Sequence, residues 1–462
     1  MVTFIKHLIK NSAQSLFYSL KPGKNIFLFL IILILLGAFS AIWSELLWLW
    51  SAALSLFAIA LLWDLLQLYA IKALWAERDA PGKMSLGLWH DIKLTLHYES
   101  GRFSTNNLRL DVFDCYPVNC EYRGLPQKIS IQSGQWMTLQ YQIKPLKRGN
   151  EQFTRVQCLI QSPWSFWLKN HFLNVHSATM IYPNFAAISQ YALLATENHL
   201  SQLGIRKIRR RGEGMDFHQL REYREGDSLK QIDWKATSRL RKLISREYQD
   251  EKDQEILFLL DCGRRMLSHD GELSHFDHSL NAMLLLSYVA LHQGDAIGFS
   301  TFATADDKNT QRWLPAKKGM ATIQSLLNNV YDLHASAVTP DYTQGVTQLL
   351  LRQKKRALII VLTNLRDEDS HDLMNALQLL QRKHLVILAS LKEQALEQAM
   401  LAPIVDFSDA LLLASSCDYQ SQRQKMFDNL NARGVNYLDV TPDKLAVRLV
   451  NRYLDIKSSG QL

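Results

Sequence analysis

The sequence predicts a protein of several domains: an N-terminal transmembrane α-hairpin, a β-sandwich-like domain and a doubly wound α/β domain. Three patterns predict this order. Two long apolar runs come first, strands of period two follow, and short apolar strands then alternate with amphipathic helices. A chain of 462 residues has room for about three such units, at roughly 100–200 residues per domain.

The composition narrows the class of protein. Apolar residues make up 47% of the chain and charged residues 21%, which excludes a mostly disordered protein. The net charge of +8 is small for this length, so it excludes an acidic tail protein and a histone-like polycation. Five scattered cysteines indicate reduced thiols in a cytosolic compartment: Cys115, Cys120, Cys158, Cys262 and Cys417.

The predicted hairpin covers residues 26–75 and follows a cytoplasmic segment, residues 1–25. Ile26–Trp43 is uncharged and just long enough to cross a bilayer. Only Ser44 and Glu45 separate it from a second apolar run, so the two helices must form a hairpin. Five tryptophans lie near the ends of these runs, as expected at bilayer interfaces: Trp43, Trp48, Trp50, Trp63 and Trp75.

The flanking charges predict the orientation of the hairpin. Its turn carries only Glu45, whereas lysine and arginine flank both ends: Lys6, Lys10, Lys21, Lys24, Lys72, Arg78 and Lys83. The positive-inside rule then places both termini and the soluble domains in the cytoplasm. A cleaved signal peptide and a buried core hairpin are the less favoured alternatives.

Residues 85–185 are predicted to form the β-rich domain. The predicted strands alternate with Gly, Asn and Pro signals, which indicates an antiparallel sandwich or small barrel: Ile92–Tyr98, Leu108–Asp114, Lys128–Gln132, Trp136–Pro145 and more within Val156–Ile181. Four aromatic residues in the last stretch are expected in the core rather than on a ligand surface: Trp164, Phe166, Trp167 and Phe172.

Residues 251–462 are predicted to form the α/β domain with a parallel sheet covered on both faces. The expected strands are Glu255–Asp261, Ala296–Phe302, Arg356–Leu365, His384–Leu391 and Val435–Val440. The ligand crevice of such a sheet lies at the carboxyl ends of its strands, near Asp261, Thr363 and Asn364. Neither a dinucleotide-binding glycine fingerprint after the first strand nor a P-loop is present in the sequence.

A basic connector, residues 200–250, joins the two soluble domains. Residues 206–247 hold thirteen Lys or Arg and seven Asp or Glu, a net +6 of the chain's +8. Because the charges interleave, we expect intramolecular ion pairs more than a phosphate-binding face. We also expect Asp227 to cap a short helix that Trp234 packs onto a neighbour. An anionic-lipid reading of Arg206–Arg211 remains open.

The connector also carries a motif that resembles the signature of domain-of-unknown-function family 58 (DUF58). The matching residues are Gly212, Gly214, Asp216, Arg221, Tyr223, Gly226, Asp227, Asp233, Trp234, Lys235 and Arg239. The resemblance implies a two-pass protein of the bacterial inner membrane with a von Willebrand factor A-like C-terminal domain. It also implies work with a MoxR-type AAA+ ATPase.

A von Willebrand-like domain would hold a divalent ion through D-x-S-x-S, a threonine and a later aspartate. This chain keeps Asp261 but has Gly263 and Arg265 in place of the serines, and Asn364 in place of the later Asp. Thr343 is the remaining candidate ligand. We therefore expect a degenerate site without a cofactor, in which Asp261 pairs with Arg264 or Arg265, and Mg²⁺ at Asp261 is the less favoured reading.

A second polar cluster follows the first strand of that domain. It comprises His269, Asp270, Glu272, His275, Asp277 and His278. We expect Ser274 and Asp277 to cap a helix and the histidines to be solvated, rather than a zinc site. Cys262 is expected to be buried, and the carboxylates of the connector to form ion pairs rather than an acid–base pair.

These observations favour a non-enzymatic, membrane-anchored adaptor that binds client proteins, cell-envelope or metalloprotein complexes among them, and works with the ATPase. A metal-dependent hydrolase using Asp261 with His269, His275 and His278 is one alternative. A membrane-tethered binder of nucleic acid or anionic lipid through Arg206–Arg211 is the other. We do not expect nucleic acid to be the partner, because the basic excess is interleaved with acidic residues.

Overall fold

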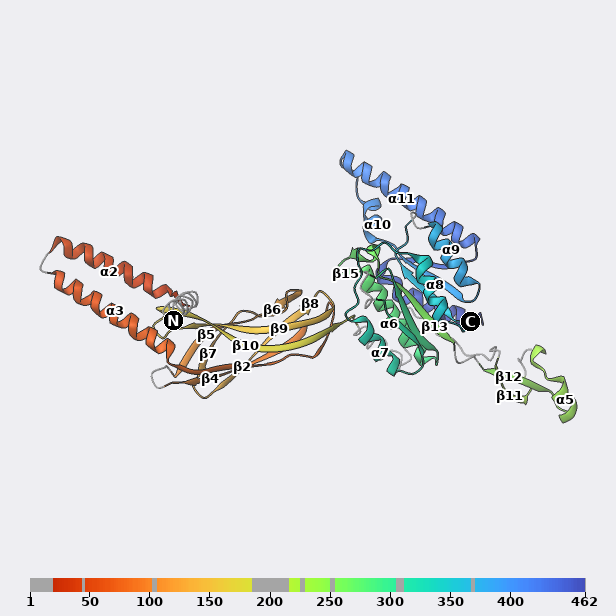
Figure 1. Ribbon diagram of the computed structural model, residues 1–462, viewed down its shortest axis with the longest axis horizontal. Coiled ribbons are helices and arrows are strands. Elements are labelled where there is room, and N and C mark those ends of the chain that lie inside the picture. Colours follow the sequence, from red (N-terminus) through yellow and green to blue (C-terminus); the bar gives the residue numbers. More distant parts are fainter. Residues whose placement is uncertain are drawn as a thin grey trace, which may run out of the picture. The chain divides into compact units, whose positions relative to one another are not determined.

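The computed structural model describes residues 20–43, 46–101, 106–184, 216–224, 229–249, 254–304, 311–366 and 370–461. The chain divides into two compact units, Met1–Ile181 and Tyr182–Leu462. Figure 1 shows the elements of each unit.

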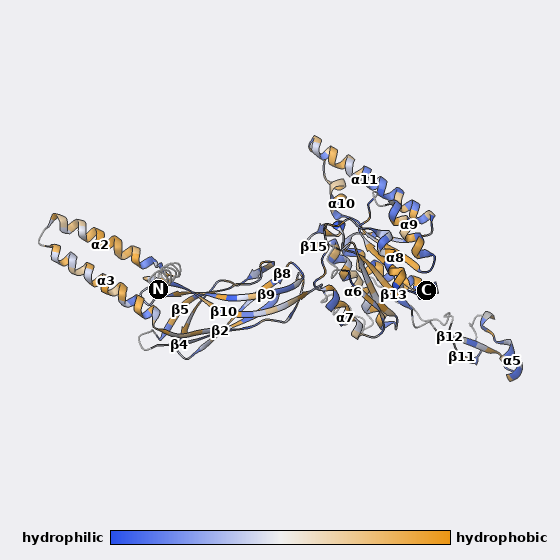
Figure 2. Ribbon diagram, in the orientation of Figure 1, coloured by the Kyte–Doolittle hydropathy of each residue, from blue (hydrophilic) through white to orange (hydrophobic). Residues whose placement is uncertain are grey.

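The N-terminal unit begins with two helices, α2 (Lys24–Ile42) and α3 (Leu47–Tyr69). Both are long and apolar enough to cross a membrane, and Figure 2 shows apolar residues along both. Only 17% and 6% of their apolar windows is buried, whereas the core hairpin of a soluble protein would be mostly covered. The helices thus form a membrane-anchor candidate, as the sequence predicted. Glu45 lies outside the described residues.

The predicted hairpin boundary at residue 75 was wrong. Residues after Ala70 form strand β2 (Ile71–Asp79), which pairs antiparallel with β4 (His90–Ser100). The apolar run continues into this strand without a break, and so it looked like more helix. Trp75 stacks on His97 across the pair, with ring centroids 4.9 Å apart, instead of ending a helix.

The β-rich region consists of two antiparallel sheets. One has the order β1-β10-β9-β5-β7, with β3 also paired to β10, and the other has the order β2-β4-β8-β6. The remaining strands are β1 (Leu20–Pro22), β3 (Lys83–Ser85), β5 (Asn107–Asp114), β6 (Cys120–Arg123), β7 (Gln127–Gln132), β8 (Trp136–Pro145), β9 (Gly149–Gln161) and β10 (Trp167–Tyr182). Alternate residues of the long strands are buried, as the period-two pattern predicted.

A buried ion pair joins the two sheets. Arg78 of β2 donates two hydrogen bonds to Asp114 of β5, at 2.8 and 2.6 Å, and both side chains are fully buried. The hydroxyl of Tyr141 also donates to Asp114, at 2.5 Å. Burial, together with the negative charge of Asp114, raises the pKa of the Tyr141 phenol well above its usual value, although Arg78 acts in the opposite direction.

The base of the hairpin is fastened to the β-rich region. Asp64 of α3 is buried and accepts hydrogen bonds from Ser162 Oγ at 2.5 Å and from the Trp164 N–H at 3.1 Å. Strand β1 pairs with β10, and a Cβ on Gly23 would come within 2.0 Å of the Ser165 carbonyl oxygen. Hydrogen bonds and close packing therefore hold both helices at their sandwich ends.

We expected the four aromatic residues near the β9–β10 turn to lie in the core. Of these, only Phe166 is buried. Trp164 and Phe172 are exposed, and Trp167 is partly buried. Phe166 packs edge-on against Phe29 of α2 and Phe57 of α3, so the turn lies at the base of the hairpin rather than inside the sandwich.

In the connector the described residues form β11 (Asp216–Glu222), β12 (Ile244–Gln249), the 3₁₀ turn Leu229–Gln231 and helix α5 (Trp234–Leu240). The cap of α5 is Asp233, which accepts from the Ala236 N–H at 2.9 Å. The predicted cap, Asp227, lies outside the described residues. Trp234 is 67% exposed, so the expectation that it packs this helix onto a neighbour was wrong.

The C-terminal domain contains a six-stranded sheet with the order β17-β16-β13-β18-β19-β20. Its strands are β13 (Glu255–Asp261), β16 (Ala296–Phe302), β17 (Trp313–Lys317), β18 (Leu358–Thr363), β19 (Leu385–Leu391) and β20 (Asn436–Val440). All neighbours are parallel except β17, an antiparallel edge strand that the sequence pattern did not predict.

Helices cover both faces of this sheet, as predicted. One face packs against α6 (His275–His292), α7 (Ala321–Val330) and α12 (Pro442–Ser458). The other face packs against α8 (Tyr342–Arg352), α9 (Ser370–Gln381) and the C-terminal half of α11 (Phe407–Ala432). Helix α10 (Gln394–Leu401) has no buried residue. The sheet is therefore the middle layer of three, with its core on either side.

Candidate functional site

The carboxyl end of β13 carries the first predicted site residue, Asp261, which is completely buried. Its Oδ2 accepts from the Thr363 hydroxyl at 2.6 Å, and its Oδ1 accepts from the Gly263 N–H at 2.7 Å. The Tyr342 hydroxyl lies 3.0 Å from Thr363 Oγ1. Both carboxylate oxygens are thus used inside the protein, by Thr363 and Gly263 rather than by the side chains of Arg264 or Arg265 as we expected.

The surroundings of Asp261 change its acidity. Burial raises the pKa of this carboxyl from 3.8 to about 6, because the charged form loses its hydration. The hydrogen bonds from Thr363 and Gly263 and the charge of Arg265 lower the pKa, but they do not cancel the effect of burial. The folded protein therefore holds the proton of this carboxyl more tightly than an exposed aspartate would.

Gly263 shows why the first serine of the ion-binding pattern is not accommodated. A Cβ at this position would lie 2.9 Å from the Val338 carbonyl oxygen and 3.2 Å from Pro340 Cδ. The same loop is held in place by the Arg264 N–H, which donates to Val338, and by the Ser336 N–H, which donates to the Cys262 carbonyl at 2.7 Å. The loop therefore occupies the space that a serine side chain would need.

The other candidate ligands are used elsewhere. Thr343 donates its hydroxyl to Asp372, which also accepts from the Tyr342 N–H, so Thr343 does not bond to Asp261. Asn364 is buried with its Nδ2 3.2 Å from His275 Nδ1 and 3.2 Å from Glu393 Oε1. Arg265 is buried, and its positive charge opposes cation binding beside Asp261.

The histidine cluster is only partly as we predicted. Ser274 and Asp277 form a complete capping box at the start of α6, which confirms the capping expectation. His275, however, is buried rather than solvated, with its Nε2 3.0 Å from Asp270 Oδ2. His278 is partly buried and burial lowers its pKa, whereas His269 is exposed. Within the described ranges, no group of three His, Cys, Asp or Glu side chains is placed to hold a metal ion.

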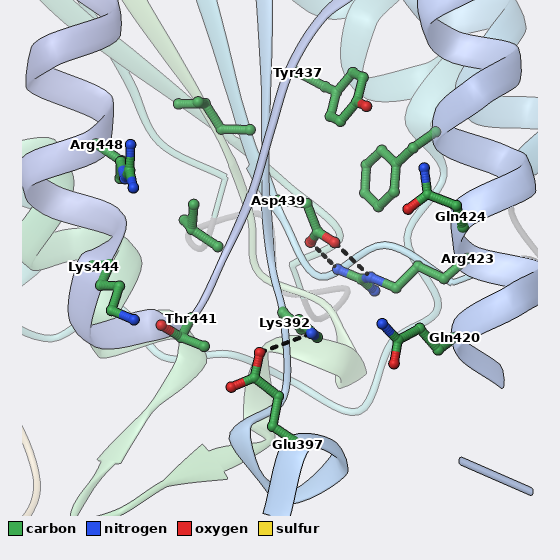
Figure 3. Close-up of a pocket in the computed structure, with 13 residues that line it drawn as sticks. Lys392, Glu397, Gln420, Arg423, Gln424, Tyr437, Asp439, Thr441, Lys444 and Arg448 are labelled. Atoms are coloured by element: carbon green, nitrogen blue, oxygen red, sulfur yellow. Dashed lines mark hydrogen bonds and ion pairs between the residues drawn. The ribbon is translucent and has the colours of Figure 1, made fainter. Parts of the chain in front are cut away.

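Sequence reasoning missed a pocket of about 480 Å³ at the carboxyl end of β20, between α11 and α12 (Figure 3). Arg423 lies on its wall and binds Asp439 through two hydrogen bonds, at 3.2 and 2.5 Å. Arg423 also donates to the carbonyls of Leu365 and Leu391 and to Ser390, so it ties together the ends of three strands.

The pocket is lined by more positive than negative side chains. Lys392 and Glu397 form a second ion pair at 2.8 Å. Lys444 and Arg448 project from α12 and are exposed, and in the part of the chain that the structure describes neither has an ion-pair partner. The pocket thus has two more positive than negative side chains, which favours anions over cations. The spacing of Lys444 and Arg448, four residues apart after a strand, was the available sequence signal.

The motif residues of the connector act mainly in local structure. Asp233 caps α5 and accepts from Arg246 at 2.9 Å, and Lys242 donates to Glu222 at 2.8 Å. These pairs confirm the predicted intramolecular ion pairing in the connector. Three motif side chains are exposed among the described residues: Trp234, Lys235 and Arg239. Gly212, Gly214, Gly226 and Arg206–Arg211 lie outside the described residues.

Comparison with known proteins finds a similarity to one family over part of the chain. Residues 219–432 match the family described as "Protein of unknown function DUF58". The match begins inside β11 and ends with α11, so it includes the Asp261 network and part of the connector motif.

The chain is also similar to the "Uncharacterized protein YeaD" of Bacillus subtilis, to which it is 21% identical over 265 residues. The match covers 57% of this chain and spans 62% of the length of that relative. Among solved structures, the CARDB domain of a Pyrococcus furiosus protein is 9% identical, with 24% of this chain and 94% of that chain covered and a TM-score of 0.17. Proximal thread matrix protein 1 from the mussel byssus is 12% identical, with 44% and 46% covered and a TM-score of 0.25. Scores this low establish no shared fold.

Proposed function

We propose that this protein is a membrane-anchored adaptor that binds other proteins and works with a MoxR-type AAA+ ATPase. In this proposal α2 and α3 hold the chain in a bacterial inner membrane, with both termini and the soluble domains in the cytoplasm. The C-terminal domain is von Willebrand factor A-like and acts without bound metal. The ATPase supplies the energy for assembly or remodelling of a client complex.

The observation that supports this proposal most directly is the closed network at Asp261. In a parallel sheet the carboxyl edge is the usual place for a ligand or a catalytic centre. Here Asp261 is buried, both of its carboxylate oxygens accept hydrogen bonds from the protein, and the Val338–Pro340 loop fills the place of a serine side chain. The part of this edge around Asp261 is therefore suited to stabilising the domain, and the adaptor binds its partners through other surfaces.

The partner is tested by co-purification from solubilised membranes with the full chain as bait. A MoxR-type ATPase should be recovered, with a yield that depends on whether ATP or ADP is present. The Asp261→Asn variant serves as a matched control and should recover the same ATPase in the same yield. Recovery of no AAA+ ATPase in either nucleotide state would refute the partnership.

The metal-independent part of the proposal has its own test. Isothermal titration of the full chain in detergent with Mg²⁺ and with Mn²⁺ should show no binding in the micromolar range. Micromolar binding that Asp261→Ala abolishes would instead favour the metal-dependent alternative. For the nucleic-acid alternative, duplex binding that weakens steeply with salt and with charge reversal at Arg209–Arg211 would be the supporting result.

A further inference from the structure

The segment that joins β19 to the core part of α11 extends away from the sheet (Figure 1). We call residues 394–415 the α10–α11 projection. None of its residues is buried, and the buried positions of α11 begin only at Ser416. The projection is nevertheless well formed, because Asp406 and Asp409 make a complete capping box at the start of α11.

The projection exposes an unusual amount of apolar surface. Six large apolar side chains are each more than half exposed: Leu401, Ile404, Val405, Phe407, Leu411 and Leu412. Phe407 is 83% exposed, and Leu411 follows it by one helical turn, so the two lie on the same face of α11. A soluble domain rarely leaves such a cluster in water unless another surface covers it.

The charge around this cluster indicates what that other surface is like. Residues 393–422 contain five Asp or Glu and no Lys or Arg, in a chain whose net charge is +8. Glu393 pairs with Arg366 and Glu397 with Lys392. Asp406, Asp409 and Asp418 have no cationic partner among the residues that the structure describes. The apolar cluster is therefore flanked by carboxylates that no Lys or Arg of the described residues pairs with.

This combination separates the possible occupants. An anionic bilayer or a nucleic acid would be repelled by the carboxylates, and a second copy of the projection would bring the same charges face to face. A protein groove with apolar walls and a rim of Lys and Arg satisfies both properties. Helices commonly dock into such grooves through large side chains one turn apart.

We propose that the α10–α11 projection inserts Phe407 and Leu411 into an apolar groove, bordered by Lys and Arg, on the partner ATPase. This assignment rests on the proposed function, because it names the surface through which the adaptor holds its ATPase. The capping box preforms the helix before binding, which lowers the cost of ordering it.

The test measures binding of a purified MoxR-type ATPase to the full chain in nanodiscs of uncharged lipid. The double substitution Phe407→Ser with Leu411→Ser should weaken binding about 100-fold, at roughly tenfold for each central anchor. Leu351→Ser is the matched control, because Leu351 is 67% exposed near the end of α8, and it should leave affinity unchanged. The affinity of wild type for the ATPase should also fall as salt is raised. Circular dichroism spectra and melting curves that match those of wild type show that the variants fold.

The outcomes distinguish this proposal from the function on which it rests. If the ATPase binds wild type and the double variant equally, the projection is not the docking surface, while the adaptor function stands. If the ATPase does not bind wild type at all, the proposed function fails and this assignment fails with it. If the double variant loses only self-association, or only binding to phosphatidylglycerol vesicles, the occupant is a second copy or a bilayer and the proposal is overturned.

Discussion

Asp261→Asn isolates the effect of the buried carboxyl on the stability of the α/β domain. Asparagine has nearly the same shape as aspartate, and its oxygen can still accept from the Gly263 N–H, which is 2.7 Å from Asp261 Oδ1. The Thr363 hydroxyl, which donates to Asp261 Oδ2, can instead accept from the amide nitrogen that asparagine places there. The substitution therefore removes the titration and keeps most of the packing.

The expected magnitude follows from the pKa of Asp261, about 6 in the folded protein against 3.8 in its ordinary state. About two pKa units correspond to roughly 3 kcal/mol. Because the folded state binds this proton more tightly, the stabilising contribution of the protonated carboxyl is fully present below about pH 3.8 and is lost as pH rises through about 6. The free energy of unfolding of Asp261→Asn relative to wild type should therefore rise by up to ~3 kcal/mol between pH 4 and pH 7.

The assay is native-state hydrogen exchange of the buried β13 and β18 amides in the full chain, corrected at each pH for the intrinsic exchange rate. This measurement reports the α/β domain separately, which a single unfolding curve of a multidomain protein would not. Asp418→Asn, at an exposed position, controls for the loss of a carboxylate. A difference between Asp261→Asn and wild type that stays flat from pH 4 to pH 7, or that falls with rising pH, would refute the reasoning.

Three further substitutions test other parts of the structure. Arg423→Met leaves Asp439 without its partner at the pocket and should cost about 3–5 kcal/mol of α/β-domain stability by hydrogen exchange, with Arg423→Lys intermediate because it keeps the charge but not the fork. Ser274→Ala removes the capping box of α6 and should cost about 1 kcal/mol by the same measurement, whereas Ser274→Gly should cost less. Asp64→Ala leaves Ser162 Oγ and the Trp164 N–H without their acceptor, so hydrogen exchange at residues 162–166 should accelerate by about tenfold or more. Asp64→Asn should restore much of the protection. Unchanged exchange in Asp64→Ala would show that the contact contributes nothing.

Local patterns predicted much of the fold because most elements follow them. Strands β13 and β16 have the predicted bounds, since each is a short and largely apolar run. The pattern failed where pairing depends on distant residues. Strand β1 has only three residues and is defined by its pairing with β10, and β17 contains Pro315 and is held at a sheet edge by β16.

The candidate site was predictable in position but not in detail. The parallel-sheet rule placed Asp261, Thr363 and Asn364 at one edge, because each ends or follows a strand. The rule could not show that Thr343 bonds to Asp372 while its neighbour Tyr342 bonds to Thr363. The local sequence around residues 342 and 343 is the same whichever of the two side chains faces the sheet edge. The role of Arg423 could not be predicted either, because its contacts with Leu365, Leu391 and Asp439 join segments that are separated in the sequence.

The fastening at the base of the hairpin couples the sandwich to the two candidate membrane-spanning helices. Only Gly23 separates β1 from α2 and only Ala70 separates α3 from β2, so neither helix is joined to a strand through a flexible linker. Because Asp64 is also bonded to the β9–β10 turn, we expect the helices and the sandwich to rotate together. A change of helix tilt with bilayer thickness would therefore swing the far end of the sandwich through the same angle, which converts a property of the lipid into a displacement in the solvent.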